Sequence, residues 1–69
     1  MDRIRIDFTG AMGYSKFIEF DAPGSVDNTL EDIGRVTAMG SLYIVKDANG
    51  RIIAAIPGRR IEAVSVVQG

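Results

Sequence analysis

Charged and apolar side chains alternate along the first part of the chain, and this period of two limits the possible folds more than any other feature. From Arg3 to Phe8, the apolar residues fall on one face of an extended chain and the charged residues on the other. Such alternation is typical of a β-strand with one buried face. The segment 15–21 repeats the pattern, except that Phe17 falls on the polar face. A glycine-bounded turn at 10–13 joins the two segments, so we predict a β-hairpin.

The C-terminal half predicts three further strands. We expect them over residues 41–47, 51–56 and 60–67, because apolar and β-branched residues fill these runs and turn residues separate them. A strand, a tight Pro-Gly break and a short final strand together resemble the end of an SH3-like barrel. Ile56, Pro57 and Gly58 alone carry that resemblance. It implies an architecture and no function.

The turn between residues 47 and 51 allows two registers for the hairpin around it. A two-residue turn would place Asp47 opposite Ile52. A type I turn with a glycine in the left-handed bulge position would instead place Asp47 opposite Arg51 and Val45 opposite Ile53. We favour the second register because it pairs opposite charges and sets apolar residues against one another.

Residues 22–40 predict at most one short helix. Asn28 followed by Glu31 fits an N-cap with a carboxylate at the third helical position, and Gly34 fits the residue just after a helix. We therefore expect a helix over residues 29–33 and a short strand over residues 35–38. The whole chain, residues 1–69, is then predicted to form a single small all-β domain with mainly antiparallel strands. Its architecture would be an SH3-like barrel or a curled five-to-six-stranded sheet with at most one short helix.

Both faces of the last three strands are apolar, although an antiparallel sheet with one face in water should be polar on that face. One face carries Leu42, Ile44, Ile52, Ala54 and Ile56. A chain of 69 residues holds no second layer large enough to cover the other face, and large exposed apolar patches mark interfaces. We therefore predict a homo-oligomer, with a tightly curled barrel as the alternative. The predicted interface residues are Val45, Ile53, Ala55, Val64 and Val66.

The composition excludes several kinds of chemistry. The chain has no cysteine and no histidine, which removes disulfides, thiolate nucleophiles, Cys/His metal sites and the usual general base at neutral pH. Glu31 and Asp32 are neighbours that do not face one another on a helix. Glu19 and Asp21 are explained by the solvated face of a strand. We therefore predict that the protein is not an enzyme and that it holds no metal and no cofactor.

The sequence also suggests where the chain resides. Residues 1–7 alternate charge and isoleucine, unlike a signal peptide. The longest apolar run, residues 52–56, is far shorter than the roughly 20 residues that a membrane helix needs. We expect a cytoplasmic protein with no membrane partner. Its formal charge of -1 and its pI near 5.1 provide no basic field, so nucleic acid is not an expected partner.

Charge is divided unevenly along the chain. Residues 16–32 hold five acids and one lysine, whereas residues 33–69 hold five cations and two acids. Two of these cations are adjacent arginines that follow a Pro-Gly pair, and two guanidinium groups with a glycine N–H can hold an anion together. A tyrosine of the preceding hairpin can reach the same end of the sheet. The predicted ligand-binding residues are Gly58, Arg59, Arg60 and Tyr43.

These features lead to two hypotheses of function. The first is a non-enzymatic, homo-oligomeric binding protein that captures or sequesters an anionic, nucleotide-like small molecule in a pocket at the subunit interface. An inhibitory or anti-defence protein of a virus or mobile element would fit this description. The second is a protein–protein interaction module, such as an adaptor, an inhibitor or a small assembly component, with no small ligand. It would dock its partner on the acidic segment 21–32 or on the outer sheet face, including by addition of a strand at an open edge.

Overall fold

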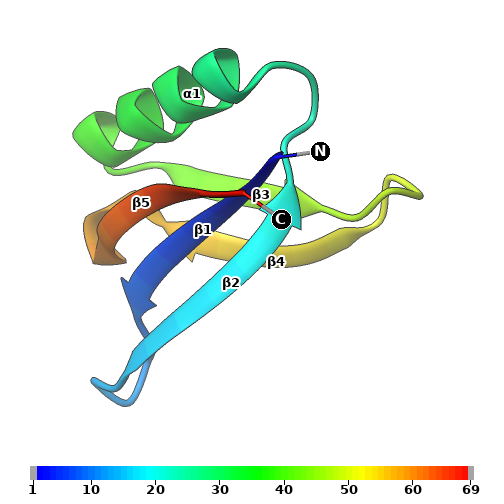
Figure 1. The fold of residues 1–69 in the computed structure, drawn as a ribbon. Coiled ribbons are helices and arrows are strands. Elements are labelled where there is room, and N and C mark those ends of the chain that lie inside the picture. Colours follow the sequence, from blue (N-terminus) through cyan, green and yellow to red (C-terminus); the bar gives the residue numbers. More distant parts are fainter. Residues whose placement is uncertain (1, 69) are drawn as a thin grey trace.

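The computed structural model describes residues 2–68 (Figure 1). Within that range it contains five strands, one α-helix and one turn of 3-10 helix. Their bounds are β1 Asp2–Thr9, β2 Ser15–Asp21, α1 Val26–Met39, β3 Leu42–Lys46, β4 Ile52–Pro57, η1 Gly58–Arg60 and β5 Ile61–Gln68. Each of these strands begins and ends within one residue of its predicted bounds.

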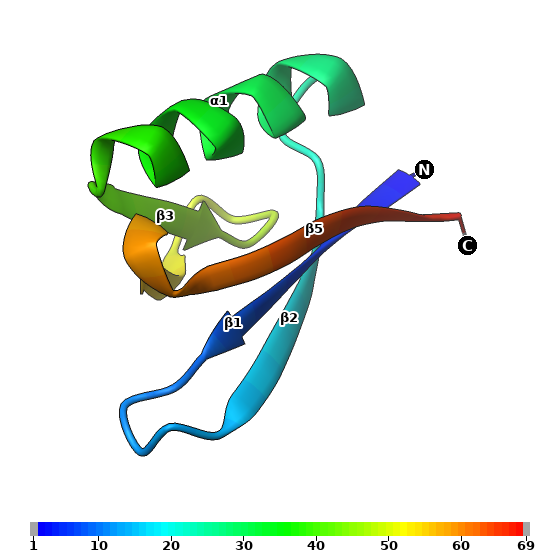
Figure 2. The ribbon, with the colours of Figure 1, turned by 90° about the vertical axis from the view of Figure 1, so that its left-hand side faces the viewer.

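The strands form two sheets. β1 is the centre of a three-stranded sheet in the order β2-β1-β5, and β3 and β4 form a two-stranded sheet. Every pairing is antiparallel. The three-stranded sheet crosses the β3–β4 hairpin, and α1 lies along one side of the molecule (Figures 1 and 2), in contact with β3, β5 and η1. The prediction of a curled, mainly antiparallel sheet with one helix is confirmed, and over residues 2–68 the sheets do not close into a barrel.

A single core lies between these elements. Its buried members are Ile4, Ile6, Phe20, Ile33, Val45 and Ile56. They come from β1, β2, α1, β3 and β4, and β5 adds Ile61 and Val64 as half-buried neighbours. Because an isolated two-stranded hairpin is marginal in water, the β3–β4 hairpin depends on this shared core.

The first hairpin follows its predicted pattern. Ile4 pairs with Phe20 across the two strands, and both are buried together with Ile6. Phe17 lies on the opposite face, where 56% of the residue is exposed. The guanidinium carbon of Arg5 lies 4.1 Å from the centroid of the Phe17 ring. A cation–π contact therefore accounts for an aromatic residue on a charged face.

The helix is longer than predicted. α1 begins after Ser25, whose Oγ accepts a hydrogen bond at 3.1 Å from a backbone N–H of the first turn. It ends at Gly40, which adopts the left-handed conformation with a φ of 69°. The predicted helix over residues 29–33 is present but its predicted bounds are too short, and the predicted strand over residues 35–38 is wrong because those residues belong to α1. A glycine inside a helix costs only about 1 kcal/mol relative to alanine, and the caps and packing of α1 offset this cost, so Gly34 does not end the helix.

The second hairpin contains an irregularity that the sequence analysis did not anticipate. The N–H of Asp47 donates to the carbonyl of Arg51 at 2.9 Å, as the favoured turn requires. The register then shifts between Val45 and Lys46, and Val45 pairs with Ala54. Ile53, the predicted partner of Val45, is the extra residue of the bulge. The bulge therefore places Ala54 and Ile56 on the same face of the hairpin as Val45, whereas the favoured register places them on the opposite face.

This shift corrects the predicted interface. Val45 is 1% exposed and Ile56 is 2% exposed, so both belong to the core. The assignment of Val45 to an outer interface is wrong. Val64 pairs with Ile6 and also packs against the core, so its assignment to the outer face is wrong as well. The other three predicted interface residues stay exposed, and their role in an interface stays a prediction: Ile53, Ala55 and Val66.

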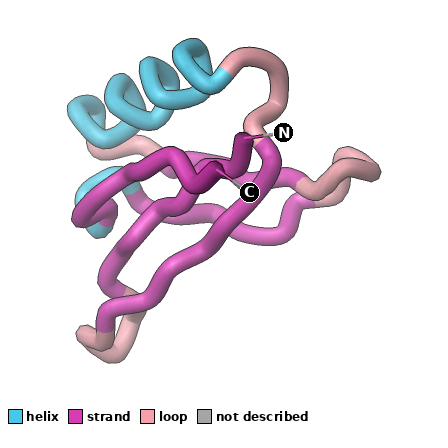
Figure 3. The backbone as a smooth tube through the Cα atoms, in the orientation of Figure 1, coloured by secondary structure: helices cyan, strands magenta, loops and turns pink. Residues whose placement is uncertain are grey.

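Irregular backbone is confined to short connections. Figure 3 shows the β1–β2 turn and the β3–β4 turn projecting from the two sheets. A third connection leads from the end of β2 to the start of α1. Within residues 2–68, no helix is both long enough and apolar enough to cross a membrane.

Candidate functional site

The predicted anion-binding turn forms the 3-10 helix η1. Gly58 is buried, and its N–H donates to the carbonyl of Ser41 at 2.7 Å. This N–H is therefore already hydrogen-bonded within the chain, and the prediction that it is free to bind an anion is wrong. The backbone approaches so closely here that a Cβ on Gly58 would lie 2.5 Å from the carbonyl oxygen of Val36.

The two arginines of η1 are exposed, and neither forms a salt bridge within residues 2–68. The Arg59 side chain runs beside Gly40, where a Cβ would lie 3.2 Å from Arg59 Nε. Gly40 ends α1, and the last turn of α1 contains no basic residue. Because carbonyl groups at a helix C-terminus carry partial negative charge, Arg59 supplies the missing cation there. Its position thus has a structural explanation that needs no ligand.

Tyr43 does not share a cavity with these arginines. It lines a separate cleft to which Gly58, Arg59 and Arg60 do not contribute. Its ring centroid lies 6.2 Å from that of Phe20. Burial of the hydroxyl raises the pKa of Tyr43 above its ordinary value, and the negative charge of Asp32 in α1 raises it further. At neutral pH this phenol is therefore protonated and uncharged.

The cleft that contains Tyr43 has a volume of about 560 Å³. It lies where the end of β2 and the following loop meet the end of β3 and the following turn. We call it the β2–β3 cleft. The largest apolar residues that line it are Phe20, Tyr43, Ile44, Val45 and Ile53. The charged residues that line it are Arg3, Glu19, Asp21, Lys46 and Asp47.

The charged side chains leave the β2–β3 cleft with an excess of negative charge, because three carboxylates accompany two cations. Arg3 lies between two of the carboxylates, with its Nε 3.8 Å from Glu19 Oε1 and its Nη1 3.6 Å from Asp21 Oδ1. Its Nη2 also donates to the backbone carbonyl of Glu19 at 3.2 Å. The cleft therefore offers apolar contact inside and favours a positive group at its mouth.

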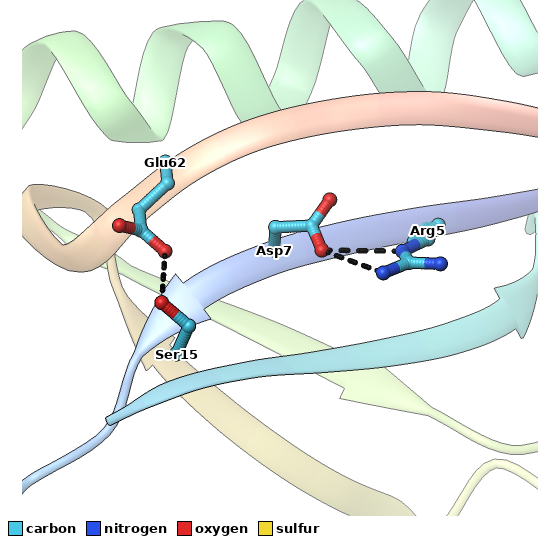
Figure 4. Close-up of polar contacts among 4 residues, drawn as sticks. All are labelled: Arg5, Asp7, Ser15 and Glu62. Atoms are coloured by element: carbon cyan, nitrogen blue, oxygen red, sulfur yellow. Dashed lines mark hydrogen bonds and ion pairs between the residues drawn. The ribbon is translucent and has the colours of Figure 1, made fainter.

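Other polar contacts of the sheet satisfy one another away from the cleft (Figure 4). The Arg5 guanidinium donates to Asp7 Oδ1 at 3.0 Å and 3.1 Å, and the hydroxyl of Ser15 donates to Glu62 Oε1 at 3.5 Å. Among residues 2–68, no group of three acids could hold a metal ion. No buried side-chain nitrogen or oxygen in that range lacks a hydrogen-bond partner. The β2–β3 cleft is therefore the feature of the described chain best suited to bind another molecule.

Sequence reasoning found only part of this cleft. It singled out Tyr43 and Ile53, but for two different surfaces, and it did not place Phe20 or Arg3 in a site. Asp21 had been assigned to the acidic segment of the interaction hypothesis. These residues are joined by the packing of the end of β2 against β3, where the rings of Phe20 and Tyr43 meet, and no local sequence signal marks that contact.

No protein-family model matches the chain, and comparisons with curated proteins and with solved structures found no match.

Proposed function

We propose that this protein is a protein–protein interaction module and that the β2–β3 cleft holds a side chain of its partner. The observation that supports this most directly is an apolar cavity of about 560 Å³ with a charged mouth. Its volume falls within the range of roughly 300–1,000 Å³ that is usual for binding pockets. A bulky apolar side chain buried there would contribute about 1.5–3 kcal/mol to association.

The charges of the cleft support a protein partner over a small anion. The Arg3 guanidinium already lies within 4 Å of two carboxylates, those of Glu19 and Asp21. A phosphate would have to compete with both carboxylates for this cation. A basic side chain of a partner would instead join two carboxylates that have one guanidinium between them.

We predict that an aspartate at the mouth of the cleft weakens partner binding. Ile53 lines the cleft and is 50% exposed, so Ile53→Asp adds a carboxylate to an apolar lining with little loss of packing. The matched control is Ile52→Asp, because Ile52 is 63% exposed and does not line the cleft. Short random peptides would be selected against the wild-type protein, and their affinities for all three proteins measured by fluorescence polarisation.

The expected result is a loss of roughly tenfold or more in affinity for Ile53→Asp, equivalent to at least about 1.4 kcal/mol, with Ile52→Asp close to the wild type. Circular dichroism would verify that both variants are folded. Selected peptides that bind Ile53→Asp as tightly as the wild-type protein would contradict the proposed function. Failure to select any peptide that binds would contradict it too.

A second proposal is capture of an anionic, nucleotide-like ligand by a homo-oligomer. It is supported by the exposed guanidinium groups of Arg59 and Arg60, which have no ionic partner within residues 2–68. Exposed apolar residues on the outer face of the β3–β4 hairpin support self-association: Leu42, Ile44 and Ile52. A native mass spectrum tests both parts. It would have to show a defined multimer with added small-molecule mass that the double variant Arg59→Ala/Arg60→Ala loses.

A further inference from the structure

The outer edge of β2 is an open strand edge beside the cleft. The sheet order β2-β1-β5 leaves one side of β2 unpaired. The N–H of Gly10 donates to the carbonyl of Tyr14 at 2.8 Å, and hydrogen-bonded pairs alternate along an antiparallel ladder from this point. The backbone of Phe20 therefore bonds to β1, whereas the backbone groups of Glu19 and Asp21 point away from β1.

A contact already present supports this assignment. The carbonyl of Glu19 accepts a hydrogen bond from Arg3 Nη2 at 3.2 Å, as expected of a carbonyl that is directed away from the β1 ladder. The Arg3 side chain is 44% exposed, so the contact is exchangeable. An N–H from another chain can take its place.

We infer that the partner binds as an extended strand added to β2 at Glu19–Asp21. This inference rests on the proposed function and adds the binding mode and the chemistry of the partner. Main-chain hydrogen bonds to Glu19 and Asp21 would hold the added strand. Side chains of directly opposed residues lie on the same face of a sheet. The partner residue opposite Phe20 therefore enters the β2–β3 cleft.

Basic residues fit on either side of that anchor. Successive side chains of a strand alternate between faces, so the two neighbours lie on the outer face, opposite Glu19 and Asp21. These two carboxylates share the single guanidinium of Arg3, and their side chains are 33% and 49% exposed. Arg3, Glu19 and Asp21 together carry one net negative charge. Two cations from the partner would change this to one net positive charge. The geometry points to a partner segment of the form basic–bulky apolar–basic.

The experiment uses synthetic peptides as probes for the full chain. A labelled peptide with the central sequence Lys-Phe-Lys is compared with Glu-Phe-Glu and Lys-Ser-Lys in the same flanks. Two further peptides carry N-methyl groups, one on the amides of both lysines and one on the amide of the phenylalanine. In a strand added antiparallel to β2, the lysine amides face the edge of β2 and the phenylalanine amide faces away.

We expect Lys-Phe-Lys to bind roughly tenfold or more tightly than Glu-Phe-Glu, Lys-Ser-Lys and the lysine-methylated peptide. The phenylalanine-methylated peptide should bind like the parent. Binding should also protect the amides of Glu19 and Asp21 from hydrogen exchange, with little change at Phe20, whose amide already bonds to β1.

The possible outcomes separate this inference from the function on which it rests. Equal binding of the two methylated peptides, or of Lys-Phe-Lys and Glu-Phe-Glu, overturns strand addition or the basic flanks. If the selected peptides still depend on Ile53 in that case, the proposed function stands. Binding of Lys-Phe-Lys that Ile53→Asp does not weaken overturns the inference, and if the selected peptides behave the same way the proposed function falls with it.

Discussion

Replacing Gly58 with alanine is expected to destabilise the protein by about 2–5 kcal/mol, from overpacking and from disturbance of a buried hydrogen bond. A Cβ at this position would lie 2.5 Å from the carbonyl oxygen of Val36. It would also lie 3.0 Å from the carbonyl oxygen of Ser41 and 3.0 Å from the Cα of Thr37. All three atoms belong to the backbone, so no side chain can move aside. The end of α1 would have to separate from η1, which weakens the 2.7 Å hydrogen bond between Gly58 and Ser41.

This cost is large for a short chain. A domain of this length is stable by about 3–10 kcal/mol in total, so the substitution removes a substantial part of that free energy. Thermal unfolding followed by circular dichroism should show a fall in Tm of roughly 10 °C or more. The φ of Gly58 is not positive, and the loss therefore reports the close approach of the backbones and not a conformation reserved for glycine.

Gly34 provides the matched control. It lies within α1, is exposed, and has no atom within 4 Å of the position that a Cβ would occupy. Gly34→Ala should therefore stabilise the protein by about 0.5–1 kcal/mol, because alanine loses less backbone entropy in a helix. Similar Tm values for the two variants would contradict the contact between η1 and α1.

The strands were predictable because the information that specifies them is local. An alternation of period two places Ile4 and Ile6 on one face without reference to the rest of the chain, and the structure buries both. The turn at residues 47–51 was predictable for the same reason, since its chemistry lies in a few consecutive residues. The favoured pairing of Asp47 with Arg51 is present.

The helix was mispredicted because two local signals conflicted. The interior glycine and the Asn28 cap indicated a short helix, whereas Ser25 and Gly40 cap a longer one. Tertiary packing decides between them. The part of α1 beyond Gly34 packs against η1, where a Cβ on Gly58 would lie 2.5 Å from the carbonyl oxygen of Val36.

The cleft was not predictable because it depends on contacts between distant segments. Phe20 and Tyr43 meet only when two separate hairpins pack together, and no spacing along the chain encodes that contact. The bulge in β4 is similarly non-local. A bulge at Ile53 allows both Val45 and Ile56 to face the core, which a regular ladder in the favoured register would not permit. Burial of two β-branched residues outweighs the local preference for regular pairing.

The largest effect that we expect from a single substitution tests this register. Val45→Asp should abolish folding, because it places a carboxylate at a position that is 1% exposed and whose neighbours are apolar. An unpaired charge in such surroundings costs several kcal/mol, and a loss of about 4 kcal/mol or more approaches or exceeds the stability of a domain this small. Circular dichroism and the dispersion of amide signals in an NMR spectrum would measure the loss.

The same substitution at the adjacent residue should be tolerated. Ile44 points to the outer face of the β3–β4 hairpin and is 40% exposed, so Ile44→Asp should cost about 1 kcal/mol or less, mainly through the lower strand preference of aspartate. A regular ladder that pairs Val45 with Ile53 and keeps Ile56 in the core predicts the opposite order, with Ile44 inside and Val45 outside. Unfolding of Ile44→Asp together with a stable Val45→Asp would therefore contradict the bulge. It would also contradict the β2–β3 cleft, whose lining includes the buried side chain of Val45.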